Sequence, residues 1–246
     1  MNKGASEETS RDMVRGPAGS PAASDLETNI PAGAVEVFGS RAPLAQRYVE
    51  LLGGPGIERG LIGPREKERL WDRHVLNSAA MASHVEPEAV VVDIGSGAGL
   101  PGIPLSLARP DLRVTLVEPL LRRVTFLKEV IEELDLDVRV VRGRAEDRDV
   151  IDLVGGADVV TARAVAPLGK LAGWAAPLLR PGGRMVALKG ESAPEEVERD
   201  RSALSGAGLH DIEVEFVKAP DAEPTRLVVG TMKTKMKARG RQRRRR

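Results

Sequence analysis

Four glycines and one aspartate form a compact loop between two apolar stretches of the chain. The apolar residues 90–92 lead through Asp93 into the glycines, and a new apolar segment follows. This order predicts a strand, a tight turn and the start of a helix. Glycines leave backbone N–H groups open to a ligand, and the first turn of a helix has N–H groups without partners. The loop is therefore a candidate cofactor site, built on Gly95, Gly97, Gly99 and Gly102.

Two nucleotide-like cofactors, a dinucleotide and S-adenosylmethionine, compete for this loop. The Gly-x-Gly-x-x-Gly spacing of residues 97–102 matches the dinucleotide motif, but in that motif the first glycine directly follows the strand. Here that glycine is Gly95, and counting from it places Leu100 where the third glycine belongs. A pyrophosphate gains nothing from Asp93, whereas this carboxylate can order the loop or face the ammonium of S-adenosylmethionine. The loop favours S-adenosylmethionine, and the alternative is a strand–helix turn that binds nothing.

Two further acidic residues follow predicted strands. Glu118 comes directly after the strand at residues 113–117, where its carboxylate can accept hydrogen bonds from both hydroxyls of a ribose. Glu146 follows the third predicted strand. Ligands of parallel sheets bind beyond the carboxyl ends of the strands. We therefore expect Asp93, Glu118 and Glu146 to converge at that edge.

Strand and helix patterns alternate from residue 89 onward. The apolar residues within 120–134 have helical spacing, and the residues around 181–183 read Pro-Gly-Gly, which ends the helix before them. This alternation predicts an α/β fold, doubly wound, with a mainly parallel seven-stranded sheet and helices on both faces, in a Rossmann-like arrangement. We expect strands at residues 89–94, 113–117, 138–142, 157–161, 184–189, 212–217 and 226–232, and helices at 42–52, 64–84, 120–134, 167–179 and 194–204.

The composition excludes several kinds of chemistry. The 246 residues contain no cysteine, which excludes disulfides, thiolate metal sites and methyl transfer through a cysteine nucleophile. Apolar residues make up 41% of the chain, which supports a sizeable core. No apolar run approaches the ~20 residues of a membrane span, and the N-terminus lacks the apolar core of a signal peptide. We expect a cytoplasmic monomer without a membrane or metal partner.

The two ends of the chain differ from its middle. Residues 1–35 are rich in Gly, Ala, Ser, Pro and acids without an apolar period, which predicts a disordered leader. Residues 233–246 carry nine positive charges and no acid, so a net charge of +1 leaves about −8 on the rest. This tail could add affinity for RNA phosphates without sequence specificity, be a solvated arm, or face an anionic membrane, although no apolar anchor accompanies it. Between the ends we predict one folded domain, residues 36–232, with an N-terminal helical segment at 36–86.

Five segments, taken in order, carry a more specific pattern: LWDRHVLNS at residues 70–78, DIGSGAGLPGIPL at 93–105, RRVTFL at 122–127, ARAVA at 162–166 and ALKG at 187–190. Together they resemble the bacterial small-subunit ribosomal RNA guanine-N7 methyltransferases (RsmG, also called GidB), a family of class I methyltransferases. The glycine loop alone marks only the superfamily, and its Leu-Pro-Gly-Ile-Pro extension adds the specificity. The resemblance implies methyl transfer from S-adenosylmethionine to N7 of one guanine in the 530 loop of 16S rRNA, free or within the small ribosomal subunit.

The resemblance also implies roles for single residues. Gly95 and Leu100 would line the cofactor site, and Ala145 with Glu146 would hold the adenine. Arg163, after the fourth strand, would lie beside the methyl donor and the target base. Many relatives have an aspartate at the position of the ribose-binding glutamate, and the longer acid can still reach the two hydroxyls.

Several of these residues also have plainer interpretations. Arg163 could be a buried structural arginine paired with Asp93 or Glu146. Lys189, at the end of the fifth strand, faces the expected cleft and is a candidate for catalysis. His74, with Arg73, could pack its helix as readily as contact RNA. The two tryptophans, at positions 71 and 174, are expected in the core.

The residues after the fourth strand bear on the target atom. Methyltransferases that act on exocyclic amines usually carry Asn/Asp-Pro-Pro-aromatic there, whereas this chain has Thr161-Ala162-Arg163-Ala164. Guanine N7 has an in-plane lone pair and no proton to lose, so its methylation needs positioning rather than a general base. An arginine can bind O6, a phosphate or the carboxylate of the donor. The missing base is consistent with N7.

Two other functions fit parts of the pattern. A class I methyltransferase for a small molecule or protein would be favoured by a substrate lid inserted after the fifth strand, and no such insertion is present in the sequence. An RNA-binding factor without catalysis would keep the fold alone, and the intact Asp93 loop with Glu118 disfavours it.

Overall fold

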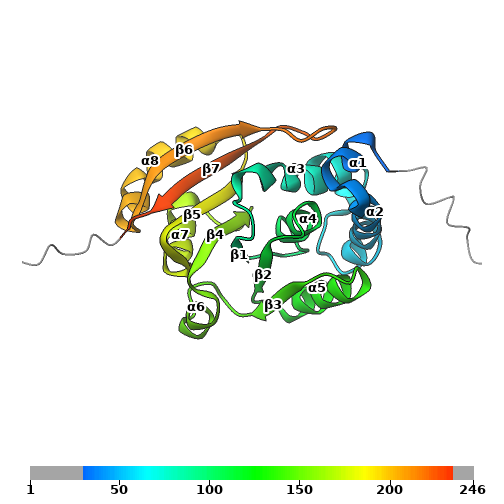
Figure 1. Cartoon of the computed structure of the whole chain (residues 1–246), viewed down its shortest axis with the longest axis horizontal. Coiled ribbons are helices and arrows are strands. Elements are labelled where there is room, and N and C mark those ends of the chain that lie inside the picture. The colour runs from blue at the N-terminus through cyan, green and yellow to red at the C-terminus, as the bar shows by residue number, and fades with distance from the viewer. Residues whose placement is uncertain (1–29, 235–246) are drawn as a thin grey trace, which may run out of the picture.

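A computed structural model describes residues 30–234, and its strands form one seven-stranded sheet. The strand order is β3-β2-β1-β4-β5-β7-β6, with β1 to β5 parallel and β7 antiparallel to both of its neighbours (Figure 1). This arrangement confirms the predicted doubly wound α/β fold. The strands are β1 (Val90–Ile94), β2 (Arg113–Glu118), β3 (Val138–Arg142), β4 (Ala157–Arg163), β5 (Leu179–Lys189), β6 (Leu209–Val217) and β7 (Thr225–Met232).

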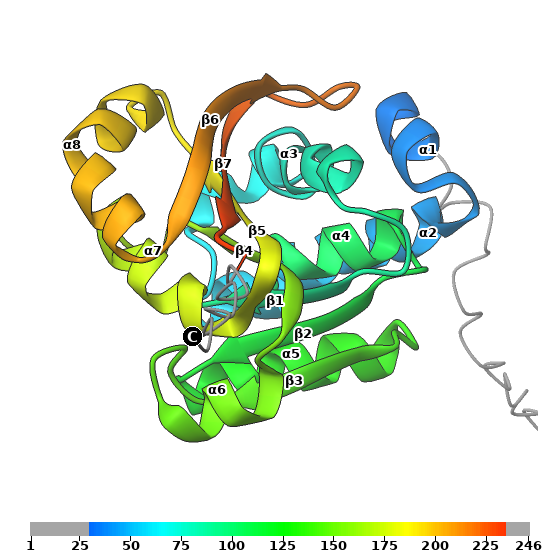
Figure 2. The ribbon, with the colours of Figure 1, turned by 60° about the vertical axis from the view of Figure 1, so that its left-hand side comes forward.

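Helices cover both faces of the sheet (Figure 2). One buried cluster joins the sheet to α1 to α5, and a second joins its other face to α6, α7 and α8. The helices are α1 (Ala32–Phe38), α2 (Ala42–Leu51), α3 (Leu76–Ala79), α4 (Gly102–Ala108), α5 (Leu121–Glu133), α6 (Arg148–Val154), α7 (Leu168–Ala175) and α8 (Ala193–Gly206).

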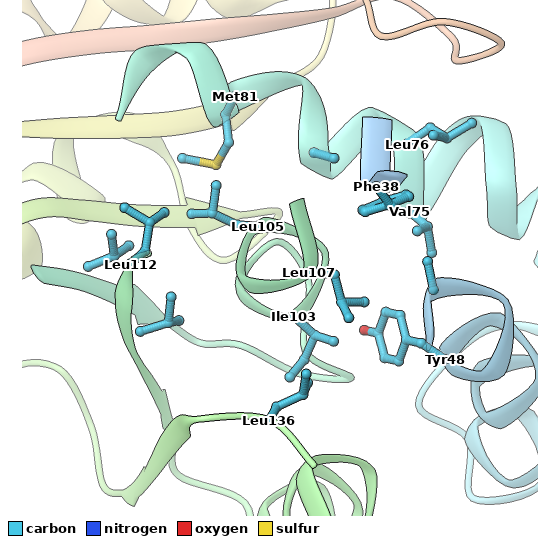
Figure 3. Packing of buried hydrophobic residues seen from close by; sticks show 14 of the residues in the cluster. Phe38, Tyr48, Val75, Leu76, Met81, Ile103, Leu105, Leu107, Leu112 and Leu136 are labelled. Carbon is cyan, nitrogen blue, oxygen red and sulfur yellow. The ribbon is translucent and has the colours of Figure 1, made fainter. Parts of the chain in front are cut away.

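Side chains of alternate residues of the central strand β1 pack into the two buried clusters on opposite faces of the sheet. Val91 packs into the cluster under the N-terminal helices, whereas Val92 and Ile94 pack under α6 to α8. Both faces are apolar because helices cover both, as expected of a parallel sheet. Figure 3 shows the first cluster, where Tyr48 of α2 and the α4 residues Ile103 and Leu107 meet.

The N-terminal segment departs most from its predicted form. Helix α1 begins at Ala32, inside the segment 1–35 predicted as a leader, so that boundary was wrong. The helix expected at 64–84 is irregular, with 3-10 turns at Pro64–Arg69 and Ala80–His84 and π turns at Leu70–Val75 on either side of the short α3. Tertiary contacts compete with the regular backbone bonds here, as described below for Arg163.

Three smaller differences have local causes. Helix α6 was not predicted, because seven residues give too few turns for a periodic signal. Strand β5 starts at Leu179 rather than at 184, with Gly182 in the left-handed region at φ 78°. Helix α8 extends beyond the predicted 194–204. Residues 1–29 of the leader and 235–246 of the basic tail lie outside the described part of the chain.

The loop between β6 and β7 closes over the N-terminal segment (Figure 1). The Glu223 N–H donates to Asp72 O at 3.0 Å, and Asn77 Nδ2 donates to Glu223 O at 3.0 Å. Asp221 accepts the Gly33 N–H at 2.7 Å. These contacts hold residues 70–79 beside the carboxyl ends of β4 and β5, where they form one wall of the site.

Candidate functional site

The glycine loop folds over the carboxyl end of β1. Asp93 Oδ2 accepts the Gly102 N–H at 3.1 Å, which ties the last strand residues to the start of α4. The N–H groups of Gly95 and Ser96 donate to Val117 O of β2 at 2.8 and 3.2 Å. A Cβ on Gly102 would lie 2.3 Å from Leu116 Cδ2, so only glycine allows this approach. Of the two roles open to Asp93, the structure contains the ordering of the loop.

Asp93 is a buried carboxyl with one unsatisfied oxygen. The residue is fully buried, and Oδ1 has no hydrogen-bond partner within the described residues. Burial disfavours the charged form and raises the pKa of Asp93 to about 7. A buried carboxylate with an unpaired oxygen costs folding free energy, so Asp93 destabilises the folded loop when it is ionised.

This burial predicts a pH dependence of stability. An acid with a raised pKa in the folded state binds more protons folded than unfolded, so stability falls as pH rises from about 4 to about 7. Asp93→Asn should remove that part of the fall, because the amide does not titrate. The measurement is the melting temperature of both proteins from pH 4 to pH 8. Equal slopes in the two proteins would contradict the burial argument.

Tyr48 supports the loop from the N-terminal helices. Its ring is fully buried in the first cluster (Figure 3). The Tyr48 hydroxyl donates to Ala98 O at 2.9 Å. A Cβ on Gly99, whose φ is 105°, would come within 2.9 Å of that hydroxyl. Tyr48 is not among the predicted site residues, although it is the single tyrosine of the chain and lies on a predicted helix. The N-terminal segment is therefore part of the cofactor loop's foundation.

A pocket of about 310 Å³ lies beside the loop at the ends of β1, β2 and β3, and it is called the smaller pocket below. Its residues fit the adenosyl group of S-adenosylmethionine: Val165, Trp174 and Ala145 offer apolar surface for a purine, and Glu118 offers a carboxylate for hydroxyls. Above Gly97 the space is open, since a Cβ there would meet only Gly95 O at 3.8 Å. The lining residues are Ile94, Gly95, Val117, Glu118, Pro119, Leu120, Arg123, Gly143, Arg144, Ala145, Glu146, Ala164, Val165 and Trp174.

Glu118 ties the pocket to the loop. Its Oε2 accepts the Gly97 N–H at 3.0 Å and its Oε1 accepts the Leu120 N–H at 3.0 Å. Arg123 Nη1 lies 3.6 Å from Oε2. A carboxylate has about four acceptor sites, so these bonds leave capacity for ribose hydroxyls.

A larger pocket, about 780 Å³, adjoins the smaller one, and Ala164 lines both. Ala164 has φ 52°, an uncommon conformation for a residue with a Cβ, and such strain concentrates at functional sites. The larger pocket opens between the N-terminal segment and the ends of β5, β6 and β7. It is lined by Arg73, Asn77, Arg163, Ala164, Leu188, Lys189, Gly190, Glu191, Glu196, Phe216, Glu223, Pro224, Thr225 and Arg226.

Arg163 connects β4 to the irregular N-terminal segment. Its Nη1 donates to His74 O at 3.2 Å and to Ser78 Oγ at 3.0 Å. Its Nη2 donates to Arg73 O at 2.9 Å and to His74 Nδ1 at 2.9 Å. The predicted alternative, in which Arg163 pairs with Asp93 or Glu146, is wrong, because these four acceptors are its partners. Burial lowers the pKa of Arg163 to about 10, which leaves it charged at neutral pH.

His74 is held in one tautomer by its two neighbours. Nδ1 accepts from Arg163, so the proton of a neutral ring is on Nε2, which lies 2.8 Å from Glu66 Oε2. Burial, reinforced by the Arg163 charge, lowers the pKa of His74. The chain Glu66–His74–Arg163 therefore positions the guanidinium through a neutral imidazole. For His74 the structure favours the helix-packing interpretation.

We predict that methyl transfer weakens at acid pH through His74. Protonation of Nδ1 would replace an acceptor by a donor and repel Arg163, so kcat should fall only at a pH below the ordinary histidine pKa of about 6.5, because the pKa of His74 in the folded protein is lowered. Because the folded pKa is depressed, stability is also lost as pH falls through this range. His74→Asn keeps an acceptor and does not titrate. Its pH–kcat profile should be flatter than that of the wild type, and identical profiles would refute the role of His74.

Lys189 is tethered at the opposite wall. Its Nζ donates to Glu196 Oε2 at 2.8 Å and to Ala166 O at 2.9 Å, and both charged side chains are largely buried. The lysine therefore holds the 164–166 turn against α8. The structure places it in the larger pocket, as expected of an edge facing the cleft, with its ammonium engaged by protein groups.

Some of the other predicted residues line the smaller pocket, and the rest shape or support the glycine loop. Gly95, Glu118, Ala145 and Glu146 line the smaller pocket. Asp93 and Leu100 lie beneath the loop, where Leu100 packs against the first cluster. Gly97 binds Glu118 and Gly99 approaches Tyr48, so both shape the loop. The expected convergence thus holds for Glu118 and Glu146.

The two tryptophans have different surroundings. Trp71 packs against the first cluster, with its ring 6.4 Å from that of Phe38, as predicted. Trp174 borders the second cluster and also lines the smaller pocket. Its helical spacing in the sequence could not distinguish core from pocket wall.

Residues 30–234 contain neither a cluster of metal-binding side chains nor a helix that could span a membrane. Nowhere in this range do three His, Asp or Glu side chains gather as they would around a metal ion. None of its helices combines the length and the apolar character needed to cross a membrane.

Two solved structures with the same fold carry the name methyltransferase. The S-adenosylmethionine-dependent methyltransferase SibL in its apo form aligns with a TM-score of 0.54 at 18% identity, covering 85% of this chain and 72% of that one. A predicted O-methyltransferase from Agrobacterium tumefaciens aligns with a TM-score of 0.52 at 16% identity, covering 64% and 80%. At these identities the likeness shows the class I methyltransferase fold.

Sequence relatives define the family. A protein named ribosomal RNA small subunit methyltransferase G from Mycolicibacterium gilvum is 57% identical over 199 residues, covering 81% of this chain and 88% of its own. The protein of that name from Rhodococcus jostii is 60% identical over 183 residues, covering 74% and 81%. The sequence profile described as rRNA small subunit methyltransferase G matches residues 41–226. The chain belongs to the rRNA small subunit methyltransferase G family.

Proposed function

We propose that this protein transfers a methyl group from S-adenosylmethionine to N7 of one guanine in the 530 loop of small-subunit (16S) rRNA. One observation carries the proposal beyond the family: two pockets of different character meet at Ala164. The smaller suits an adenosyl group, and the larger is wide and polar enough for a base that has left its stack. The shared residue is where donor and acceptor would face each other.

The residues of the smaller pocket would hold the donor. Gly95 would contact it through backbone, Glu118 would accept the ribose hydroxyls, and Ala145 with Glu146 would border the adenine beside Trp174. Asp93 would act from below, by ordering the loop and by attracting the ammonium end. S-adenosylmethionine supplies an electrophilic methyl group on a sulfonium. The chain's own contribution is to fix the direction from which the acceptor reaches it.

The acceptor requires positioning and no proton transfer. Guanine N7 has an in-plane lone pair, and alignment of reacting atoms can supply about 7–11 kcal/mol of the barrier. Arg163 is rigidly held at the junction of the pockets. We propose that it positions the N-terminal wall of the larger pocket and places a positive charge near the acceptor. Lys189 would hold the 164–166 turn that carries Ala164. In this proposal both are positioning residues.

We further propose that one copy of the chain acts alone. Residues of this chain line the donor pocket, the acceptor pocket and the point where the two meet. Methyl transfer to guanine N7, with Arg163 as a positioning residue, requires no metal ion. Sedimentation of the protein with and without rRNA would test the stoichiometry, and a two-to-one complex would contradict it.

The direct test uses the full chain with methyl-labelled donor. Small-subunit rRNA and 30S subunits from cells lacking this family's enzyme should each be offered, next to bulk cell protein and a small-molecule extract. We expect label in rRNA alone. Label in protein or small molecules would favour a different methyltransferase. Calorimetry showing no binding of S-adenosylmethionine would favour a factor without catalysis.

A further inference from the structure

Phe216 is an exposed aromatic residue beside the larger pocket. Its side chain is 66% exposed, whereas the other two phenylalanines, Phe38 and Phe126, are 5% and 1% exposed. It lies near the end of β6, the edge strand of the sheet, and lines the pocket. Folding alone does not account for this ring, because it contributes little to either buried cluster.

A cross-strand row connects this ring to the proposed active site. Phe216 of β6 is paired with Arg226 of β7, and Arg226 is paired with Lys189 of β5. Directly paired residues of neighbouring strands point to the same face, about 5 Å apart per strand. All three line the larger pocket. The row leads from the tethered lysine outward to the exposed ring.

The Arg226 guanidinium lies over one face of the Phe216 ring. The guanidinium carbon of Arg226 lies 5.8 Å from the centroid of the Phe216 ring. Aromatic rings and guanidinium planes are the two surfaces on which unpaired RNA bases stack. Lys189 is neutralised by Glu196, while within residues 30–234 neither Arg163 nor Arg226 has a carboxylate at ion-pair distance. Within residues 30–234 the pocket therefore has two arginines without a carboxylate partner against one carboxylate without a cationic partner, Glu191, which leaves a positive excess for an anionic ligand.

We infer that Phe216 and Arg226 form a stacking platform for an unpaired RNA base that neighbours the methylated guanine. The inference rests on the proposed function, and it adds a binding contact for the nucleotide next to the target guanine. An RNA fits better than a protein partner because the walls around the ring are charged and polar rather than apolar. The platform would keep the strand in line while the target base enters toward Ala164.

The test compares variants of the ring on rRNA substrate. Phe216→Ala should lower kcat/KM for rRNA by about 5- to 150-fold, which is the measured range for one base stacked on an aromatic residue. The loss should appear in KM, while the Kd for S-adenosylmethionine stays at the wild-type value. Phe216→Trp should restore most of the loss. Leu153→Ala, which truncates a 51% exposed residue on α6 outside both pockets, is the matched control and should have no effect.

An altered substrate makes the test specific for stacking. Small-subunit rRNA can be assembled by ligation with a synthetic segment in which one neighbour of the target guanine is abasic. On the RNA that lacks the stacked base, wild type and Phe216→Ala should be equal. Full activity of Phe216→Ala on intact rRNA, or an equal loss on every abasic RNA, would overturn the platform but not the proposed function. Absence of methyl transfer by the wild type to both this rRNA and 30S subunits would overturn both.

Discussion

Alanine in place of Arg163 should lower kcat for methyl transfer to rRNA by about 100-fold, since a misplacement of about 1 Å near the reacting atoms costs that much. The side chain donates to four acceptors on residues 73–78, from Arg73 O to Ser78 Oγ. Its removal frees the N-terminal wall of the larger pocket and leaves three partly buried acceptors unpaired. The free energy of unfolding should also fall, by about 1–3 kcal/mol.

Two variants separate geometry from charge. Arg163→Lys keeps the charge but cannot reach the four acceptors, so it should remain strongly impaired. Ser78→Ala removes one acceptor and should cost less than either. Single-turnover rates with saturating donor, together with urea unfolding of each variant, provide the measurement. Wild-type kcat in folded Arg163→Ala would remove Arg163 from the account.

The second large effect should come from Glu118. Its carboxylate fixes the N–H groups of Gly97 and Leu120 and faces the smaller pocket. Hydrogen bonds to a charged group contribute about 1.5–3 kcal/mol each. Glu118→Ala should therefore weaken binding of S-adenosylmethionine by about 100-fold or more, as measured by calorimetry.

The conservative variant refines this prediction. Glu118→Gln keeps one acceptor oxygen and the side-chain volume, so its affinity should lie between those of wild type and Glu118→Ala. Affinity for rRNA in the absence of donor should be unchanged in both. An unaltered Kd for S-adenosylmethionine in Glu118→Ala would place the cofactor elsewhere.

Local patterns in the sequence predicted the sheet and the glycine loop well. Strand β1 and the loop after it combine a buried apolar run with glycines whose φ angles are positive, and both signals are local. Helix α1 and the irregular turns at Leu70–Val75 were mispredicted because their form depends on distant partners. Two carbonyl oxygens of these turns accept hydrogen bonds from Arg163, some 90 residues away.

The site was predictable in its donor half and less so in its acceptor half. Glu118 and Ala145 follow strands, so their place beside the loop follows from topology. The partners of Arg163 and Lys189 come from separate elements, and no spacing in the sequence shows that both side chains are already engaged. Tyr48 was missed for the same reason, since its bond to Ala98 joins the N-terminal helices to the loop. The catalytic roles of these residues stay predictions.

The position and atom of methylation test the central claim most directly. After reaction of the full chain with unmethylated 30S subunits, borohydride and aniline cleave the RNA at N7-methylguanosine, and primer extension locates the break. We predict one new stop, at a guanine of the 530 loop, that requires both protein and S-adenosylmethionine. Labelled methyl groups in the rRNA without a cleavage stop there would contradict N7 of that guanine as the acceptor.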